Sequence, residues 1–293
     1  MTDAGALRAP ATTLSPQEFE EVRRFLYERA GLYFADHKKY LLETRLGRCM
    51  GDAGVDTVKE YLAVLRSPVR GRQEILRLLD AVTTHETSFF RHRPQLDAFQ
   101  RHVLPEVLKA QAARGRRAAR IWSAACSSGE EPYSLAMLIL EALGAEAARW
   151  DVRILGTDIA VSMIEKAKKA EYTRYSFRGT PAYYAQKYFE ALGRDRFRVK
   201  DEVRRMVEFR LLNFADDLRM SRMRGFQVVF CRNALIYFDR PARRRFVAHF
   251  FAALDPGGYF FVGHSESLHG VSDAFKLIHF PGAMGYRKPP EAR

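Results

Sequence analysis

The feature that most restricts the fold of this 293-residue chain is an alternation of apolar stretches with helical patterns after residue 117. The predicted strands are 119–126, 151–159, 225–233, 257–267 and 275–280, and the predicted helices among them are 130–143, 160–170 and 240–254. Buried strands that alternate with helices are typical of a parallel sheet covered by helices on both faces. This part of the chain is therefore predicted to be a doubly wound α/β domain.

The first 83 residues carry helical patterns alone. Ser15, Pro16 and Glu18 form a capping box with proline at the first helical position, and Gly31 marks the end of that helix. Further helices are expected over 37–50, from about residue 56, and around 75–82. We expect a helical domain over 1–83 and an α/β domain over 84–293, which also opens with a helix from residue 94. Period-two stretches within about 172–210 predict a small antiparallel β insertion.

Composition sets limits on location and partners. No apolar run reaches the roughly 18 residues of a membrane helix, and the N-terminus lacks the pattern of a signal peptide. Cys49, Cys126 and Cys231 are too few for a disulfide framework and lack zinc spacing, so we expect a cytoplasmic protein without a metal. The net charge of +13 indicates a polyanionic partner (nucleic acid, an anionic membrane surface or an acidic protein) or simply a basic solvated surface.

Three loops follow the carboxyl ends of predicted strands, where open α/β sheets bind their ligands. They span residues 124–131, 157–159 and 231–237. Asp158 ends the second strand, where a carboxylate typically binds a ribose, although an Asp before a helix is equally an N-cap. The first loop contains Gly129 but no GxGxxG pattern, which argues against a dinucleotide.

Glu130 and Glu131 open the helix after the first loop, where a bound phosphate would be repelled. Both glutamates complement the helix dipole. They also suit a cofactor with a cationic tail, and S-adenosylmethionine has a ribose, an ammonium and a sulfonium but no phosphate. We interpret Glu130 as the acid that touches or orders the cofactor. For Glu131, dipole compensation is as good an interpretation as a contact with the cofactor. Glu130→Gln should then weaken cofactor binding more than Glu131→Gln.

Five segments in order carry a family resemblance: TTHETSFFRH, IWSAACSSGEEPYSLA, ILGTDIA, FQVVFCRNALIYFD and GGYFFVGHSESL. Together they resemble the chemotaxis-receptor methyltransferases of the CheR family, from about Ser15 to about Arg287. The resemblance implies an S-adenosylmethionine-dependent methyltransferase fold. It also implies a monomer that transfers methyl groups to glutamate side chains on the cytoplasmic helices of chemoreceptors.

The resemblance also implies a set of site residues. The cofactor contacts are expected from His85, Thr87, Arg91, Glu130, Asp158, Asn213, Phe214, Arg232 and Asn233. Arg91 and Tyr237 are the candidate catalytic residues, Tyr237 as a positioning group on the substrate side. Two positions depart from the family pattern, since His85 stands where asparagine is frequent and Phe214 where leucine is common. Without the motif, Arg91 would be interpreted as part of a solvated basic edge.

The chemistry implied by the family requires little from the protein's own acids and bases. A glutamate carboxylate with a pKa of about 4.3 is already ionised at neutral pH, so no general base has to create the nucleophile. Catalysis should come mainly from holding oxygen, methyl and sulfur in line and from excluding water. We find no Ser-His-Asp or paired-acid constellation in the sequence, and none is needed.

Partner binding is expected on the helical domain. Lys38, Lys39, Arg45 and Arg48 form a basic row that matches the receptor-binding helix of the family. Some family members also bind a receptor's C-terminal tail peptide on the β insertion. The turn after residues 187–195 is shorter here, which predicts no high-affinity tail binding.

Two other classes of function stay open at this point. The positive charge favours a nucleic-acid methyltransferase, although the chain lacks the NPPY-type tetrapeptide of amino-methylating enzymes. A non-catalytic module that binds cofactor or scaffolds a receptor array is the third class. The presence of Arg91, Glu130, Asp158 and Asn233 argues against such a degenerate module.

Overall fold

The computed structural model describes residues 12–291, and residues 1–11 of the expected helical domain lie outside the described residues. The chain divides between Thr84 and His85 into two compact units, here called the helical unit and the α/β unit. Across residues 12–291, every helix is too short or too polar to cross a lipid bilayer.

The helical unit consists of short amphipathic helices. Its elements are α1 (Pro16–Ala30), a 3₁₀ turn η1 (Asp36–Lys38), α2 (Lys39–Ala53), α3 (Val58–Arg66) and α4 (Gly71–Val82). The predicted capping box is confirmed, because the Ser15 hydroxyl accepts from the Glu18 amide while the Glu18 carboxylate accepts from the Ser15 amide. Gly31 ends α1 with φ 69°, a left-handed conformation that favours glycine.

A seven-stranded sheet forms the centre of the α/β unit, in the order β6-β2-β1-β7-β8-β10-β9. The strands are β1 (Ala118–Ala124), β2 (Asp151–Asp158), β6 (Val207–Leu211), β7 (Phe226–Cys231), β8 (Leu254–Val262), β9 (Lys276–Phe280) and β10 (Ala283–Arg287). Strands β6, β2, β1, β7 and β8 pair in parallel, whereas β10 is antiparallel to both β8 and β9. The doubly wound α/β prediction is confirmed.

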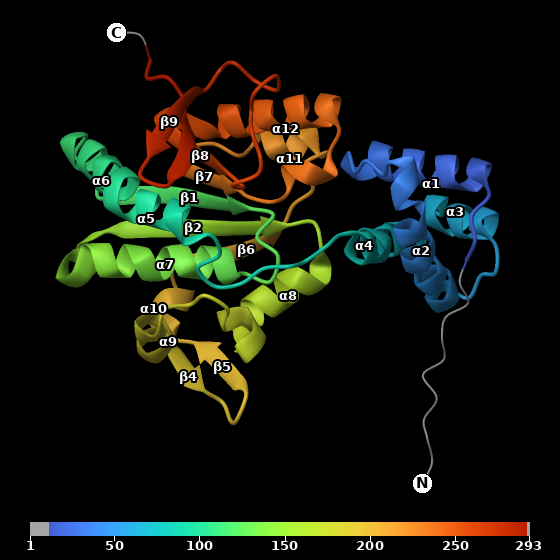
Figure 1. The fold of residues 1–293 in the computed structure, drawn as a ribbon, viewed down its shortest axis with the longest axis horizontal. Helices are drawn as coiled ribbons and strands as arrows, with labels where there is room; N and C mark the ends of the chain where they lie inside the picture. The colour runs from blue at the N-terminus through green and yellow to red at the C-terminus, as the bar shows by residue number, and fades with distance from the viewer. Residues whose placement is uncertain (1–11, 292–293) are drawn as a thin grey trace. The chain divides into compact units, whose positions relative to one another are not determined.

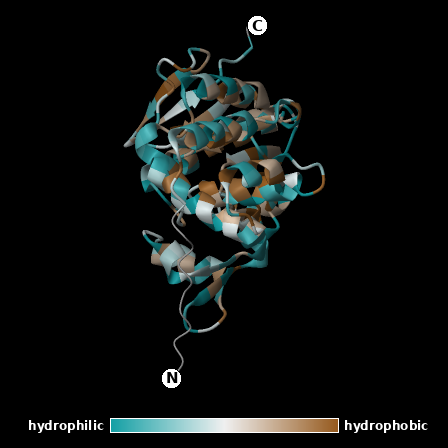
Figure 2. Ribbon diagram, turned by 90° about the vertical axis from the view of Figure 1, so that its right-hand side faces the viewer, coloured by the Kyte–Doolittle hydropathy of each residue, from teal (hydrophilic) through white to brown (hydrophobic). Residues whose placement is uncertain are grey.

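Helices cover both faces of this sheet, with α7 on one side and α12 on the other (Figure 1). The helical elements of the unit are α5 (Arg93–Ala98), a π-helical turn η2 (Phe99–Val103), α6 (Leu104–Ala113), α7 (Glu130–Leu143), η3 (Gly144–Arg149), α8 (Val161–Lys169), η4 (Arg174–Phe177), α9 (Ala182–Tyr188), α10 (Asp201–Arg204), α11 (Asp217–Ser221), η5 (Leu235–Tyr237) and α12 (Arg240–Ala253). In Figure 2 the helices carry both hydrophilic and hydrophobic residues, as expected of elements that bury one side.

Two details of the predicted sheet were wrong. Strand β10 was not expected, because its five residues follow Pro281 and Gly282 and offer only a short apolar pattern. The antiparallel insertion also ends before residue 207, because β6 pairs in parallel with β2 as an edge strand of the main sheet. An edge strand and an antiparallel strand share the same period-two pattern, so only the pairing partner distinguishes them.

The insertion itself is a three-stranded antiparallel sheet in the order β3-β5-β4, formed by β3 (Glu171–Thr173), β4 (Phe189–Ala191) and β5 (Arg196–Val199). It packs on the segment that precedes α5 through aromatic rings. The ring of Phe89 lies 4.7 Å from Tyr172, 5.3 Å from Phe177 and 4.8 Å from Phe189, measured between centroids. The insertion is therefore joined to the same segment that the TSFF motif occupies.

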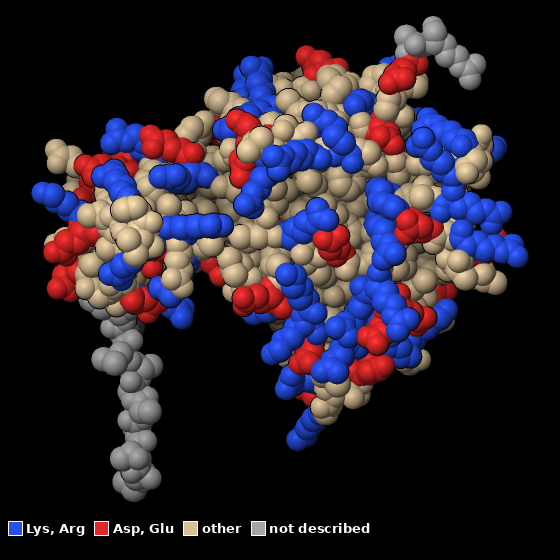
Figure 3. All heavy atoms as spheres, turned by 180° about the vertical axis from the view of Figure 1, so that it is seen from behind, with Lys and Arg blue, Asp and Glu red and all other residues tan. Residues whose placement is uncertain are grey.

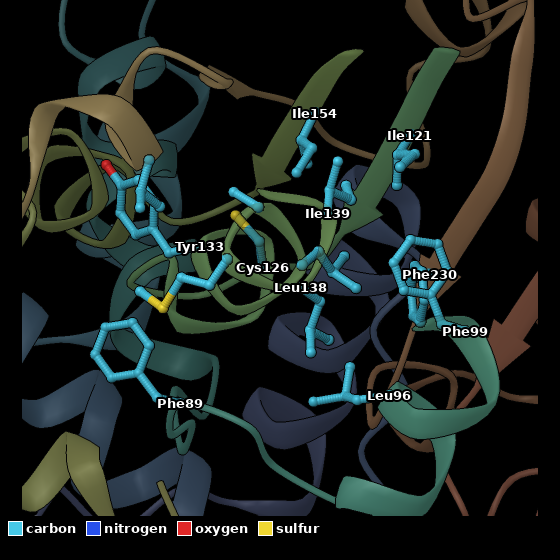
Figure 4. Close-up of a cluster of buried hydrophobic side chains, with 14 of the residues drawn as sticks. Phe89, Leu96, Phe99, Ile121, Cys126, Tyr133, Leu138, Ile139, Ile154 and Phe230 are labelled. Atoms are coloured by element: carbon cyan, nitrogen blue, oxygen red, sulfur yellow. The ribbon is translucent and has the colours of Figure 1, made fainter. Parts of the chain in front are cut away.

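The hydrophobic core lies between the sheet and the helices on one face. Ile139 of α7 points toward Ile121 and Ile154 of the sheet, Leu138 belongs to the same cluster, and Phe230 packs with Phe99 at its far side (Figure 4). All of these side chains are buried. This packing holds α7, and with it the loop that precedes it, in a fixed position against β1.

Candidate active site

The sheet reverses its order between β1 and β7, so the loops that follow these two strands diverge at one edge. Non-glycine residues with left-handed backbones concentrate in these loops and in the segment before α5. Five of the six such residues in the described part of the chain lie here: Phe90 (φ 55°), His92 (φ 55°), Ala125 (φ 57°), Ser127 (φ 49°) and Asn233 (φ 58°); the sixth, Ala170, ends α8. Each such conformation costs about 1–3 kcal/mol and is typical of functional sites. The carboxyl edge of the sheet is therefore the candidate active site.

Asp158 connects two of the loops. Its carboxylate accepts the Ser127 amide at 2.8 Å and the Ala160 amide at 3.0 Å. Burial raises the pKa of this carboxyl, and the two amide donors oppose that rise. Asp158 does not cap α8, whose N-cap is Ala160. The carboxylate retains lone pairs for a ligand's hydroxyl groups, as a ribose would require.

Glu130 lies beneath the loop that precedes α7. Its carboxylate accepts the hydroxyl of Ser128 at 2.8 Å and that of Ser176, from the insertion, at 2.9 Å. The residue is 2% exposed, and burial raises the pKa of its carboxyl. Tyr172 of the insertion also donates to the Ser128 carbonyl at 2.7 Å. This geometry suits a residue that orders the loop rather than one that lines an open site.

Glu131 has specific partners of its own. Its carboxylate accepts the Ser123 hydroxyl at 2.7 Å and pairs with the Arg232 guanidinium at 3.1 Å. The side chain is 14% exposed, whereas that of Arg232 is 3% exposed. Dipole compensation alone does not describe this residue, because it neutralises a buried arginine. Of the two glutamates, Glu131 is the one with surface left for a cationic ligand.

Arg232 joins three segments of the α/β unit. Besides the contact with Glu131, its guanidinium donates to Gln95 Oε1 at 3.0 Å and to the Arg91 carbonyl at 2.6 Å. Burial lowers the pKa of the guanidinium, and Glu131 opposes that change. The side chain thus holds the segment around Arg91 against the end of β7. A contribution from residue 232 to ligand binding would come from its backbone.

The remaining predicted residues lie around the same edge. The Arg91 guanidinium donates to the Glu86 carbonyl at 2.7 Å, and the His85 carbonyl accepts the Ser127 hydroxyl at 3.1 Å. Thr87 is half-buried, and its carbonyl accepts from Arg178 at 3.3 Å. The segment from residue 85 to 91 therefore borders the loop after β1.

The segment after β6 contributes differently. Asn213 Oδ1 accepts the Ala215 amide at 2.9 Å and shapes the turn, and its side chain is half-buried. The ring of Phe214 faces the core, where it lies 5.2 Å from Phe250 and 5.9 Å from Phe246. Only the backbone of Phe214 is thus placed to meet a ligand. Tyr237 is half-buried in the turn η5.

Sequence reasoning missed Glu266, which binds the loops after β7 and β8 together. Its Oε2 accepts the Asn233 amide at 2.7 Å and the Gly263 amide at 2.6 Å, and its Oε1 accepts the Ile236 amide at 3.2 Å. The residue is 8% exposed. A Cβ on Gly263 would stand 2.6 Å from this carboxylate, so the glycine is required by the contact. The predicted strand over 257–267 included this acid, whereas β8 ends at Val262, four residues before Glu266. The available signal was the acid in the GHSES motif.

The first loop is not built to approach a pyrophosphate. A Cβ on Gly129 would lie 2.9 Å from the Cβ of Ala167 and 3.0 Å from the ring of Phe209, so this glycine serves packing. Two carboxylates border the edge, Asp158 beyond β2 and Glu131 beyond β1. The two acids fit the ribose and the cationic tail of S-adenosylmethionine. Across residues 12–291, no three His, Cys, Asp or Glu side chains are grouped to hold a metal ion.

Comparison with known proteins agrees with this geometry. Residues 17–83 match the family described as CheR methyltransferase, all-alpha domain, and residues 85–284 match CheR methyltransferase, SAM binding domain. The chain belongs to the CheR methyltransferase family. Its α/β unit is therefore an S-adenosylmethionine-binding methyltransferase domain, preceded by the all-helical domain of the family.

Named relatives cover nearly the whole chain. Chemotaxis protein methyltransferase 1 of Pseudomonas aeruginosa is 37% identical over 273 residues, which are 92% of this chain and 97% of the relative. The chemotaxis protein methyltransferase of Vibrio parahaemolyticus is 37% identical over 281 residues, covering 94% and 98%. That of Borreliella burgdorferi is 32% identical over 257 residues, covering 88% and 90%. The chain is a methyltransferase that uses S-adenosylmethionine.

Proposed function

We propose that this methyltransferase esterifies glutamate side chains on the cytoplasmic helices of chemoreceptors, as a monomer in the cytoplasm. The observation that carries the proposal is a sheet edge bordered by Asp158 and Glu131, without a phosphate-binding loop, in a chain of the CheR family. The named relatives are chemotaxis methyltransferases, which supports a receptor substrate.

The residues of the edge divide into two groups in this proposal. Asp158 would hold the ribose, Glu131 would face the cationic tail, and the backbones of Phe214, Arg232 and Asn233 would border the adenosine and methionine parts. When bound, S-adenosylmethionine supplies a methyl group activated by its sulfonium. His85 and Thr87, from the segment before α5, complete the cofactor contacts.

Arg91 and Tyr237 act on the acceptor side. The substrate carboxylate is ionised at neutral pH, so these residues orient it rather than remove a proton. The Arg91 carbonyl is held by Arg232, and the turn that carries Tyr237 is held through the Ile236 amide by Glu266. The positions of Arg91 and Tyr237 thus depend on the buried side chains of Arg232 and Glu266.

The proposed receptor contact uses the basic side of α2. Arg48 is exposed, Lys38 is half-buried at the start of the helix, and Lys39 pairs with Glu43 at 3.5 Å. Arg45 serves the fold instead, because its guanidinium donates to the Val82 carbonyl and, at 3.2 Å, to the Thr84 hydroxyl. A cation at the end of α4 complements the helix dipole. Lys38, Lys39 and Arg48 are therefore the proposed contact residues, with Arg45 behind them.

The charge distribution supports a protein partner over nucleic acid. Acidic side chains lie among the basic ones on the face drawn in Figure 3. Several arginines of the α/β unit are paired, as Arg153 is with Asp151 at 2.8 Å and Arg210 with Glu208 at 2.6 Å. Nucleic-acid binding typically uses a continuous basic stripe. We further propose that a receptor tail peptide binds the insertion only weakly, since residues 192–195 alone connect β4 to β5.

Methyl-labelled S-adenosylmethionine tests the reaction directly. The purified chain is incubated with a receptor cytoplasmic fragment, with the same fragment whose methyl-accepting glutamates are alanine, and with nucleic acid. We expect label on the first fragment alone, released as volatile methanol in base, because esters are base-labile. Base-stable label, label on nucleic acid, or cofactor binding without transfer would each contradict the proposal.

The receptor contact is tested by charge reversal. Lys38→Glu with Arg48→Glu should lower the methylation rate at low salt and leave cofactor affinity unchanged, because charge complementarity mainly raises association rates. Lys59→Glu, an exposed change on α3, is the matched control. An unchanged rate in the double variant would refute the contact.

A further inference from the structure

A row of exposed arginines lies at the edge of the main sheet opposite the candidate active site. Strands β6, β2, β1 and β7 are parallel neighbours, so their amino ends lie on one side of the sheet. An exposed arginine stands two residues before the first residue of each strand: Arg205, Arg149, Arg116 and Arg224, in the order of the strands. These four residues are here called the arginine row.

Contacts between neighbouring strands hold the segments of the row side by side. The Asp151 amide donates to the Arg117 carbonyl at 2.8 Å, and the Arg120 amide donates to Gln227 Oε1 at 2.7 Å. Strand β6 begins opposite Ile154, three residues into β2, so its segment is set back from the other three. Because adjacent strands are about 4.8 Å apart, the row extends across about 14 Å.

The acids beside the row are already shared among arginines. Asp151 accepts from Arg120 at 2.6 Å and from Arg153 at 2.8 Å, and these guanidiniums lower the pKa of its carboxyl. Glu146 pairs with Arg149 at 2.9 Å and with a second arginine at 3.8 Å. Within residues 12–291, no carboxylate lies within 4.0 Å of the other three members of the row. Positive charge is therefore in excess, and basic side chains gather at this end of the α/β unit, on the right in Figure 3.

Residue type and spacing favour an acidic helix as the partner of this edge. The segments that carry the row contain arginine and no lysine; they are 114–117, 149–150, 204–206 and 222–225. Arginine is enriched and lysine depleted at protein interfaces, whereas a merely solvated surface accepts either. Carboxylates one turn apart on a helix are about 5.4 Å apart along its axis, close to the strand spacing of about 4.8 Å. Glu146 and Asp151 interrupt the basic stripe that nucleic acid would require.

The row is well separated from the loops of the candidate active site. Those loops follow the carboxyl ends of β1, β2 and β7, whereas the row precedes the amino ends. The seven residues of β1 span about 23 Å between the two edges. A partner bound on the row therefore leaves the candidate active site open.

We propose that the arginine row binds an acidic helix of a partner protein, which presents carboxylates along one face at intervals of one turn. The inference goes beyond the proposed function, because this partner is held at the opposite edge and is not methylated there. Each guanidinium pairs with a carboxylate, for which the planar fork of arginine is suited. The net charge of +13 thereby serves a second contact besides the proposed one on α2.

Fluorescence anisotropy with labelled peptides tests this contact, using the full chain saturated with S-adenosylhomocysteine at low salt. One alanine-rich peptide carries glutamates along one face of a helix, a second has glutamine at these positions, and a third keeps the glutamates but has prolines that prevent a helix. We expect the first peptide to bind more tightly than the other two. Equal affinity for the first and either of the others would overturn the inference.

Charge reversal locates the binding surface. Arg116→Glu with Arg224→Glu should raise the Kd of the first peptide about tenfold, because two attractions become repulsions. Lys59→Glu with Arg72→Glu, exposed changes of equal charge in the helical unit, is the matched control and should leave the Kd nearly unchanged. Equal Kd values for the two double variants would show a general charge effect and overturn the inference.

Two further measurements separate other partners and the proposed function. Tighter binding of a DNA duplex or of anionic phospholipid vesicles than of the first peptide would overturn the choice of a protein partner. The row variant should methylate a receptor fragment at the wild-type rate, and a loss there would assign the row to the receptor contact instead. A wild-type enzyme that methylates no receptor fragment would overturn the proposed function and leave the peptide results standing.

Discussion

Replacing Glu266 by glutamine tests whether one buried carboxylate holds the loops after β7 and β8 in their active arrangement. Oε2 of the carboxylate accepts hydrogen bonds from the Asn233 and Gly263 amides, and Oε1 accepts one from the Ile236 amide. Glutamine has a single acceptor oxygen. Its best orientation keeps Asn233 and Gly263 and turns its NH₂ group toward the Ile236 amide, donor against donor.

The expected cost follows from these contacts. A hydrogen bond to a charged group contributes about 1.5–3 kcal/mol and a neutral one about 0.5–1.5 kcal/mol. One bond is lost, and it is the longest at 3.2 Å, while two bonds are weakened. We therefore expect the free energy of unfolding of the α/β unit to fall by about 3 kcal/mol. Because the lost bond anchors the turn η5, methylation should fall more than cofactor affinity.

Urea unfolding, monitored by circular dichroism, gives the first quantity, and calorimetry with S-adenosylhomocysteine gives the second. Glu165→Gln, an exposed change on α8, is the matched control and should cost less than about 0.5 kcal/mol. If Glu266→Gln matched the control in stability and the wild type in methylation, the positioning role of Glu266 would be refuted.

Three further predictions concern charged side chains with specific partners. Glu131→Gln should lower the free energy of unfolding by about 3 kcal/mol, measured in urea, because it leaves Arg232 buried without its counter-ion; a cost near zero would contradict that pairing. Burial raises the pKa of Asp158, so its folded form binds a proton more tightly than the unfolded chain. The contribution of Asp158 to the free energy of unfolding should therefore increase as pH falls through the raised pKa toward about 3.9. Over the same pH range, cofactor affinity measured by calorimetry should decrease. Asp158→Asn should abolish both pH dependences. Arg45→Glu should destabilise the helical unit by about 2 kcal/mol because it removes the contacts at the end of α4, whereas Arg48→Glu should not; equal thermal stability of the two variants would show that Arg45 has no structural role.

Much of the fold was readable because its signals are local. The capping box at Ser15 and the left-handed Gly31 define α1 from within a few residues. The helix α7 begins at Glu130 and ends at Leu143, as the apolar pattern predicts. Strand β10 and the assignment of β6 were not readable, because a short strand's sheet is decided by the partner it pairs with.

The candidate site likewise has features that the sequence predicted and features that depend on distant contacts. Its location at the loops after β1, β2 and β7 followed from the order of strands and helices, and its motifs carried the family. The hydrogen-bond partners of the two glutamates could not be predicted, because Glu130 and Glu131 are neighbours with identical chemistry. Their difference comes from Ser176 and Arg232, which lie 46 and 101 residues away along the chain.

The sequence by itself thus determined the helices, most strands and the family, and it predicted the edge of the sheet that carries the candidate site. The tertiary structure decided which side chains hold that edge together, namely Asp158 on the Ser127 amide and Glu266 on three amides. Within the helical unit it also placed Arg45 against the end of α4 instead of in solvent. The physical reason is the distance along the chain over which each kind of interaction acts. Helix caps and apolar periodicity act over a few residues, whereas the partner of a buried charge is set by packing of distant segments, which no local pattern records.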